Sequence, residues 1–107
     1  METANYILAI LKRQLNIVWS WGFHSPQAFQ KGLKFKVNGF IHRGWVIVKY
    51  NDGTDLFDIS LLDINMNIKS EIEGVFFDEL VKVIDSAVER THDYEKQVND
   101  WLNSNTL

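Results

Sequence analysis

Apolar residues recur every three or four positions near the start of the chain, which predicts an amphipathic helix over residues 3–20. The main stripe consists of Ala4, Ile7, Leu8, Leu11, Leu15, Val18 and Trp19. Thr3 is the expected N-cap and Gly22 the expected end of this helix. A second, thinner stripe on its flank consists of Ile10, Ile17 and Trp21. A helix that contacts only one sheet needs a single stripe, so the second stripe predicts a further contact.

The segment after this helix begins with a dipeptide that is typical of helix starts. Ser25 resembles an N-cap and Pro26 follows it at the first helical position. We therefore expect a short turn of helix at residues 26–30, with Phe23, Ala28 and Phe29 covering one end of the core.

Polar and apolar residues alternate over residues 33–60, which predicts a three-stranded antiparallel meander. Asp52-Gly53 is a strong signal for a two-residue hairpin turn. Such a turn pairs Tyr50 with Asp55, Val48 with Phe57, and Val46 with Ile59.

Two turns compete for the first hairpin. A turn at Asn38-Gly39 places Lys34 opposite Arg43, and opposed like charges destabilise a strand pair. A turn at Arg43-Gly44 pairs Ile41 with Val46 and Val37 with Tyr50, which gathers the apolar residues on one face. The second turn is favoured, and a longer loop with the same phase stays open.

This alternation divides the predicted sheet into two unlike faces. The apolar face carries Phe35, Val37, Ile41, Val46, Val48, Tyr50, Phe57 and Ile59. The other face mixes aromatic and cationic residues, and carries Lys34, Lys36, Asn38, Phe40, His42, Trp45, Ile47, Lys49, Leu56, Asp58 and Ser60. The apolar face is expected to contact the helices.

Beyond Leu61, a turn near residues 65–67 and a fourth strand at about 68–72 account for a change of phase, and Gly74 then precedes a final helix over 75–103. Its stripe has a seven-residue period and consists of Leu80, Ile84, Ala87, Thr91, Tyr94, Val98 and Trp101. An unbroken helix of this length measures about 42 Å, whereas a six-residue strand spans about 20 Å. The helix therefore overshoots its sheet, unless a break near 90–93 folds its end back.

The predicted fold is a single α+β domain over residues 1–107. It has two layers: an N-terminal helix, an antiparallel meander of three or four strands, and a long C-terminal helix, with both helices on one sheet face. The overshoot and the second stripe predict a homodimer. Its expected interface, which could also bind another protein, consists of Ile10, Ile17, Trp21, Tyr94, Val98, Trp101 and Leu102.

The charges are sorted along the chain. Residues 1–51 carry seven basic and one acidic residue, whereas residues 52–107 carry four basic and thirteen acidic residues. The total of −3 therefore conceals two halves of opposite sign. Lys34, Lys36, Phe40, His42, Trp45 and Lys49 form a candidate face for an anionic partner such as single-stranded nucleic acid.

The residues offer little for catalysis. The chain has no cysteine, which excludes disulfides and a thiol nucleophile. Glu89, His92 and Asp93 share part of one helix surface, but such a trio is far more often solvated than a metal site. No cofactor motif is present.

Glu2 and the charges at Lys12 and Arg13 are unlike a signal peptide, and no apolar run is long enough to span a membrane. We therefore expect a cytoplasmic, non-catalytic interaction protein that forms homodimers and binds a protein partner. The alternative is a nucleic-acid accessory protein that uses the Lys and aromatic face.

Overall fold

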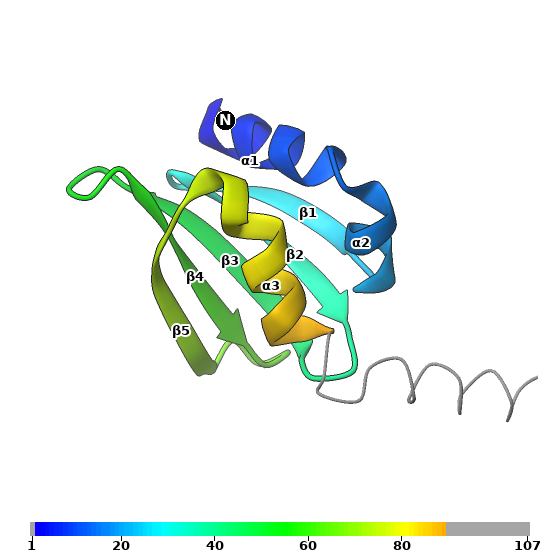
Figure 1. Ribbon diagram of the computed structural model, residues 1–107. Helices are drawn as coiled ribbons and strands as arrows, with labels where there is room; N and C mark the ends of the chain where they lie inside the picture. The colour runs from blue at the N-terminus through cyan, green and yellow to red at the C-terminus, as the bar shows by residue number, and fades with distance from the viewer. Residues whose placement is uncertain (1, 90–107) are drawn as a thin grey trace, which may run out of the picture.

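A computed structural model describes residues 2–89 and shows an α+β fold in two layers, with the helices packed on one face of an antiparallel sheet (Figure 1). The elements are α1 (Glu2–Lys12), α2 (Leu15–Ser20), β1 (His24–Phe29), β2 (Gly32–Asn38), β3 (Arg43–Asn51), β4 (Leu56–Leu62), β5 (Ile68–Val75), the 3-10 helix η1 (Phe77–Glu79) and α3 (Leu80–Val88). The predicted α+β class is confirmed. The sheet has five strands rather than three or four.

The sheet is a simple meander in which every strand pairs with its neighbour in the sequence, in the order β1-β2-β3-β4-β5. The turn and the strand predicted after Leu61 are confirmed by the 63–67 connection and by β5. Asp63 organises that connection, because its Oδ1 accepts hydrogen bonds from the backbone N–H groups of Asn65 and Asn67, both at 2.9 Å.

The core lies between the helices and the predicted apolar face of the sheet. Six of the eight residues predicted for that face are buried there: Phe35, Val37, Val46, Val48, Phe57 and Ile59. Tyr50 is half-buried against them, while Ile41 lies in the β2–β3 loop and is exposed. Leu33 and Leu61 complete the sheet's side of the core.

The predicted hairpin registers are wrong by an even number of residues. Tyr50 pairs with Phe57 rather than with Asp55, because the β3–β4 loop contains four residues, 52–55. Asn51 supports this wider loop: its backbone oxygen accepts from the N–H groups of Thr54 and Asp55, and its side chain accepts from Gly53. Even shifts leave each side chain on its predicted face, so the core prediction survives.

The first hairpin also turns earlier than predicted. Val46 pairs with Phe35 rather than with Ile41, and a four-residue loop over 39–42 joins the strands. The end of α3 holds this loop, because the carbonyl oxygen of Val88 accepts hydrogen bonds from the N–H groups of Ile41 and His42 at 2.8 and 3.1 Å. The loop thus satisfies a carbonyl that a helix C-terminus leaves unpaired.

The short helix predicted at residues 26–30 is wrong, since residues 26–29 belong to the edge strand β1 and Gln30 to the turn after it. The β1–β2 pairing shifts between His24 and Gln27, at the position of Ser25 and Pro26. Proline lacks a backbone donor, and it is tolerated in sheets at edges and bulges. β1 is an edge strand and has a bulge at this position, so Ser25-Pro26 fits the strand as well as it would fit a helix start.

The helix predicted over residues 3–20 is interrupted. The chain turns at Arg13 and Gln14, whose N–H groups bond to Ile10 and Leu11 in the tighter i→i−3 pattern. After the turn, Val18 of the main stripe is buried as predicted, together with Trp21 of the second stripe, whereas Leu15 and Trp19 of the main stripe are exposed.

The last described helix begins later than predicted. Val75 still belongs to β5, and α3 begins at Leu80 after the 3-10 turn. Leu80 and Ile84 are buried, as the stripe predicts, and Ala87 is half-buried. The predicted overshoot and its alternative break near 90–93 lie outside the described residues.

Candidate functional site

The first predicted interface falls partly into the chain's own core. Ile10 and Trp21 are buried and Ile17 packs half-buried against the same cluster. The indole Nε1–H of Trp21 donates a hydrogen bond to Asp85 Oδ1 on α3, at 2.9 Å. The second stripe therefore contacts α3 and the sheet within one chain. Tyr94, Val98, Trp101 and Leu102 lie outside the described residues, so a dimer built on them stays a prediction.

The second predicted surface forms on the sheet face that the helices leave uncovered, which we call the outer face. Lys36 of β2 pairs with Trp45 of β3, and Lys34 lies two residues before it, opposite Ile47. The ammonium group of each lysine lies 4.8 Å from the centroid of the Trp45 ring. Lys49 lies 5.6 Å from the ring of Phe29 on β1. These distances are within the range of cation–π attraction. We call Lys34, Lys36 and Lys49 the lysine row.

The two remaining residues of that predicted surface lie at the end of the sheet, in the β2–β3 loop. Phe40 is about half exposed, and its backbone N–H donates to a carboxylate oxygen of Glu89. His42 Nε2 lies 3.1 Å from the carbonyl oxygen of Trp45. Phe40 and His42 therefore connect this loop to Glu89 and to the start of β3, and they lie next to the lysine row rather than within it.

The structure adds an acidic row, of which sequence reasoning had assigned only Asp58 to this face. Ser60 pairs with Glu71, so Glu71 lies on the outer face of β5, and Glu73 shares that face because Ile72 between them packs on the core. Asp58 pairs with Lys49 across β3 and β4 and thus also lies on the outer face. We call Asp58, Glu71 and Glu73 the acidic row. Its signal in the sequence was the alternation of Glu71 and Glu73 around Ile72.

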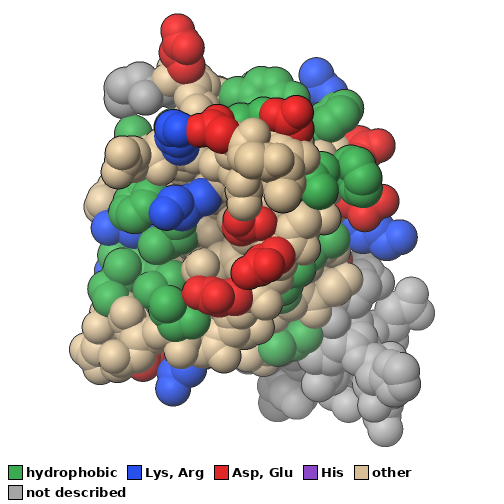
Figure 2. Space-filling model, turned by 90° about the vertical axis from the view of Figure 1, so that its left-hand side faces the viewer, with side chains coloured by type: hydrophobic (Ala, Val, Ile, Leu, Met, Phe, Trp, Pro, Cys, Tyr) green, Lys and Arg blue, Asp and Glu red, His purple; other side chains and the backbone are tan. Residues whose placement is uncertain are grey.

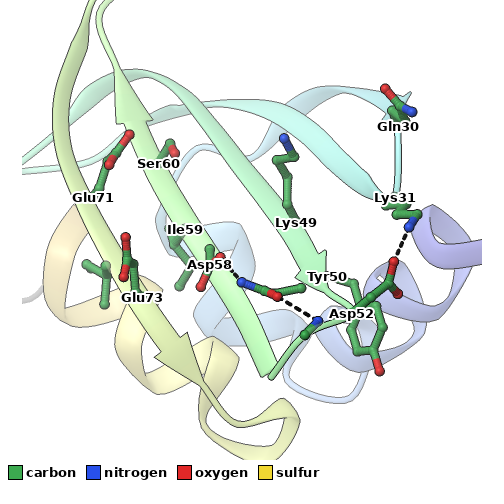
Figure 3. A pocket seen from close by; sticks show the side chains of 13 residues that line it. Gln30, Lys31, Lys49, Tyr50, Asp52, Asp58, Ile59, Ser60, Glu71 and Glu73 are labelled. Atoms are coloured by element: carbon green, nitrogen blue, oxygen red, sulfur yellow. Dashed lines mark hydrogen bonds and ion pairs between the residues drawn. The ribbon is translucent and has the colours of Figure 1, made fainter. Parts of the chain in front are cut away.

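The two rows meet at a shallow hollow of about 620 Å³ near the β3–β4 hairpin (Figure 3). Lys49, Asp58, Glu71 and Glu73 line it from three neighbouring strands. Asp58 accepts hydrogen bonds from Asn51 Nδ2 at 3.2 Å and from the Gly74 N–H at 3.1 Å. These contacts hold its carboxylate beside the strands.

The rows are side by side without neutralising each other. Within residues 2–89 the ion pairs are Lys31–Asp52 and Lys69–Asp63, and neither joins the lysine row to the acidic row. Figure 2 shows the acidic side chains gathered near the centre of one side of the molecule, with Lys or Arg and hydrophobic side chains beside them. The strand pairings place the lysine row on β2 and β3 and the acidic row on β4 and β5, so the outer face presents both signs of charge in separate bands.

The described residues hold no group of three or more His, Asp or Glu side chains placed to bind a metal ion. Glu89 of the predicted trio is buried and bonds to the β2–β3 loop, while His92 and Asp93 lie outside the described part. No helix within residues 2–89 has the length and apolarity needed to cross a membrane.

Comparisons with models of protein families, with curated proteins and with solved structures found no match to this chain.

Proposed function

We propose that this protein is a non-catalytic interaction module whose outer face binds a protein surface carrying both signs of charge, in the first instance the same face of a second copy. The separation of the lysine row on β2 and β3 from the acidic row on β4 and β5 carries this proposal. A face with two parallel bands of opposite charge is complementary to itself.

The geometry of a two-fold dimer explains this self-complementarity. In a face-to-face pair the two-fold axis lies in the plane of contact. If the axis runs along the strands between β3 and β4, the lysine row of each protomer meets the acidic row of the other. Each contact then occurs twice. Exposed pairs contribute about 0.2–1 kcal/mol each, so roughly six pairs contribute a few kcal/mol and mainly select the orientation.

Apolar area on the same face supports contact with a protein. Trp45 and Leu56 are half-buried on this face and present part of their apolar surface, whereas Ile47 and Leu62, which also point to it, are already buried within the chain. An interface generally has an apolar centre with a charged rim. On the outer face, Trp45 and Leu56 supply apolar area beside the two charged rows.

The alternative, binding of single-stranded nucleic acid, is less well supported by the same residues. The ammonium groups of Lys34 and Lys36 lie over the Trp45 ring, so less of the ring surface is open to a stacked base. The acidic row lies on the same face and repels phosphate. Nucleic-acid binding of this kind depends on several cations acting together.

Charge reversal tests the proposal. One variant carries Lys34→Glu with Lys36→Glu, and the other carries Glu71→Lys with Glu73→Lys. Each variant alone places like charges opposite each other in the dimer, whereas a mixture of the two restores both contacts. The matched control, Lys12→Glu with Lys82→Glu, makes the same change of charge at exposed positions on α1 and α3. Circular dichroism checks that each variant folds.

We expect light scattering after size exclusion to give a mass near twice 12.5 kDa for the unmodified protein at low salt. Each reversed variant should be monomeric, their mixture should form a heterodimer, and the control should remain a dimer. High salt should weaken the dimer, because exposed charges are screened. A monomer at every concentration, or dimers in both reversed variants, would contradict the proposal.

A further inference from the structure

A second surface lies at the edge of the outer face, with which it shares Leu56, where the start of α1, the β3–β4 hairpin and the segment after β5 come together. Here a groove of about 570 Å³ is lined by five aromatic residues, which are Tyr6, Tyr50, Phe57, Phe76 and Phe77. Glu2, Thr3, Asp55 and Leu56 complete its lining. We call this the aromatic groove.

The aromatic side chains of this groove are ordered around one buried ring. Phe57 is almost fully buried in the core. Tyr6 stacks on it with ring centroids 6.3 Å apart, and Tyr50 meets it edge-on at 5.5 Å. The groove is therefore anchored to the core by Phe57.

Three of these aromatic side chains remain open to solvent. Tyr6 is 51% exposed, Phe76 is 56% exposed and Phe77 is 49% exposed. Scattered exposed apolar residues are ordinary, but a contiguous group in a concave site is typical of a binding surface. The groove thus has both the shape and the apolar area for a ligand.

The charges of the groove favour a cation. The charged side chains in its lining are Glu2 and Asp55, both acidic. The Tyr50 hydroxyl donates a hydrogen bond to Asp55, and this bond raises the pKa of Tyr50, so the phenol stays neutral. The faces of aromatic rings carry negative potential and attract cations. Carboxylates and ring faces therefore point to the same kind of ligand.

We propose that the aromatic groove binds an arginine or lysine side chain from a basic segment of a protein partner. The apolar stem of such a side chain packs on the exposed rings, and its charged end reaches the carboxylates. This inference goes beyond the proposed function, because it uses a surface separate from the lysine and acidic rows.

The test is a titration of the ¹⁵N-labelled protein with a blocked pentapeptide that has one central arginine between small residues. The same peptide with citrulline, which is neutral and has nearly the same shape, is the matched ligand. The groove variants are Phe76→Ala and Asp55→Asn. Asn tolerates the positive φ of 58° at position 55. Trp19→Ala removes a similarly exposed aromatic side chain on α2, outside the groove, and serves as the control.

We expect the arginine peptide at millimolar concentrations to shift the amide signals of Tyr6, Tyr50, Asp55 and Phe76. Phe76→Ala should weaken binding about two- to thirtyfold, which is the range of a cation–π contact. Asp55→Asn should weaken it by an amount that shrinks at high salt, and Trp19→Ala should not change it.

Three results would overturn the inference. The first is an equal response to the citrulline peptide. The second is the absence of shifts in the groove at about 10 mM peptide, since even weak binding falls in this range. The third is a set of groove shifts that follow the protein concentration without peptide, because a second copy would then occupy the groove. The first two results do not depend on whether the outer face forms a dimer, and the third is measured on the variant with Lys34→Glu and Lys36→Glu, in which that dimer is broken.

Discussion

The hydrogen bond between Trp21 and Asp85 leads to a quantitative prediction. The Trp21 side chain is fully buried, and its Nε1–H donates to Asp85 Oδ1 at 2.9 Å. Asp85→Ala removes the carboxylate acceptor, so the buried Nε1–H of Trp21 loses this hydrogen bond. Hydrogen bonds to charged groups contribute about 1.5–3 kcal/mol. In a domain of this size each kcal/mol corresponds to about 4 °C, so we expect the melting temperature to fall by about 6–12 °C.

Two further variants separate the hydrogen bond from general damage to the core. Asp85→Asn keeps an oxygen acceptor in the same place, so it should lose less than half as much stability as Asp85→Ala. Trp21→Phe removes the donor, and in that background Asp85→Ala should cost less. The double-mutant cycle should therefore give a coupling energy of about 1 kcal/mol or more.

Urea unfolding followed by far-ultraviolet circular dichroism measures five proteins: the unmodified chain, Asp85→Ala, Asp85→Asn, Trp21→Phe, and the double variant with Trp21→Phe and Asp85→Ala. Equal stabilities for Asp85→Ala and Asp85→Asn would refute the assigned role of the bond. So would a coupling energy below about 0.5 kcal/mol, which is the usual range for independent sites.

Two other predictions concern the loops. A Cβ at Gly39 would lie 2.3 Å from the Val88 carbonyl oxygen, so Gly39→Ala should destabilise the protein by about 1–3 kcal/mol in urea unfolding. Gly53→Ala, where the nearest atom is 3.3 Å away, is the control, and equal losses would contradict the close approach. The hydrogen bond from the Asn67 N–H is the main cause that lowers the pKa of Asp63. The stability that ionised Asp63 contributes is therefore fully present at a pH above its ordinary pKa of 3.8, and is lost as the pH falls toward the lowered pKa. In Asp63→Asn the melting temperature should therefore fall less steeply on acidification than in the unmodified protein. If the melting temperatures of the two proteins fall in parallel between pH 7 and pH 2, Asp63 does not have this role.

Part of the candidate surface could be predicted from the strands alone. Lys34, Lys36, Trp45 and Lys49 were assigned to one face. The structure places Lys34 and Lys36 over the Trp45 ring, and Lys49 on the same face over the Phe29 ring. Asp58 was assigned to the same face, but the position of Glu71 and Glu73 beside it could not be predicted, because the phase of the chain changes after Leu61. The pairing of Ser60 with Glu71 depends on the 63–67 connection and on two irregularities in the β4–β5 ladder.

The local sequence was misleading where two structures share one signal. Ser25-Pro26 is typical of a helix start, but its place beside β2 makes it a bulge in an edge strand. The stripe through Leu15 and Trp19 continues the first helix in sequence, yet the turn at Arg13 and Gln14 moves Trp21 into the core instead. In both cases packing against distant residues outweighs a local preference.

The sequence by itself determined the class of the fold and the sorting of residues between the two faces of the central strands. The reason is that a strand has a period of two, so Val46, Val48 and Ile59 reach the core in any register shifted by an even number. Only the tertiary structure decided the registers, the added strand β1 and the neighbouring rows of opposite charge. These features depend on which distant groups meet: Val88 with the β2–β3 loop, Asp85 with Trp21, and Glu71 with Ser60.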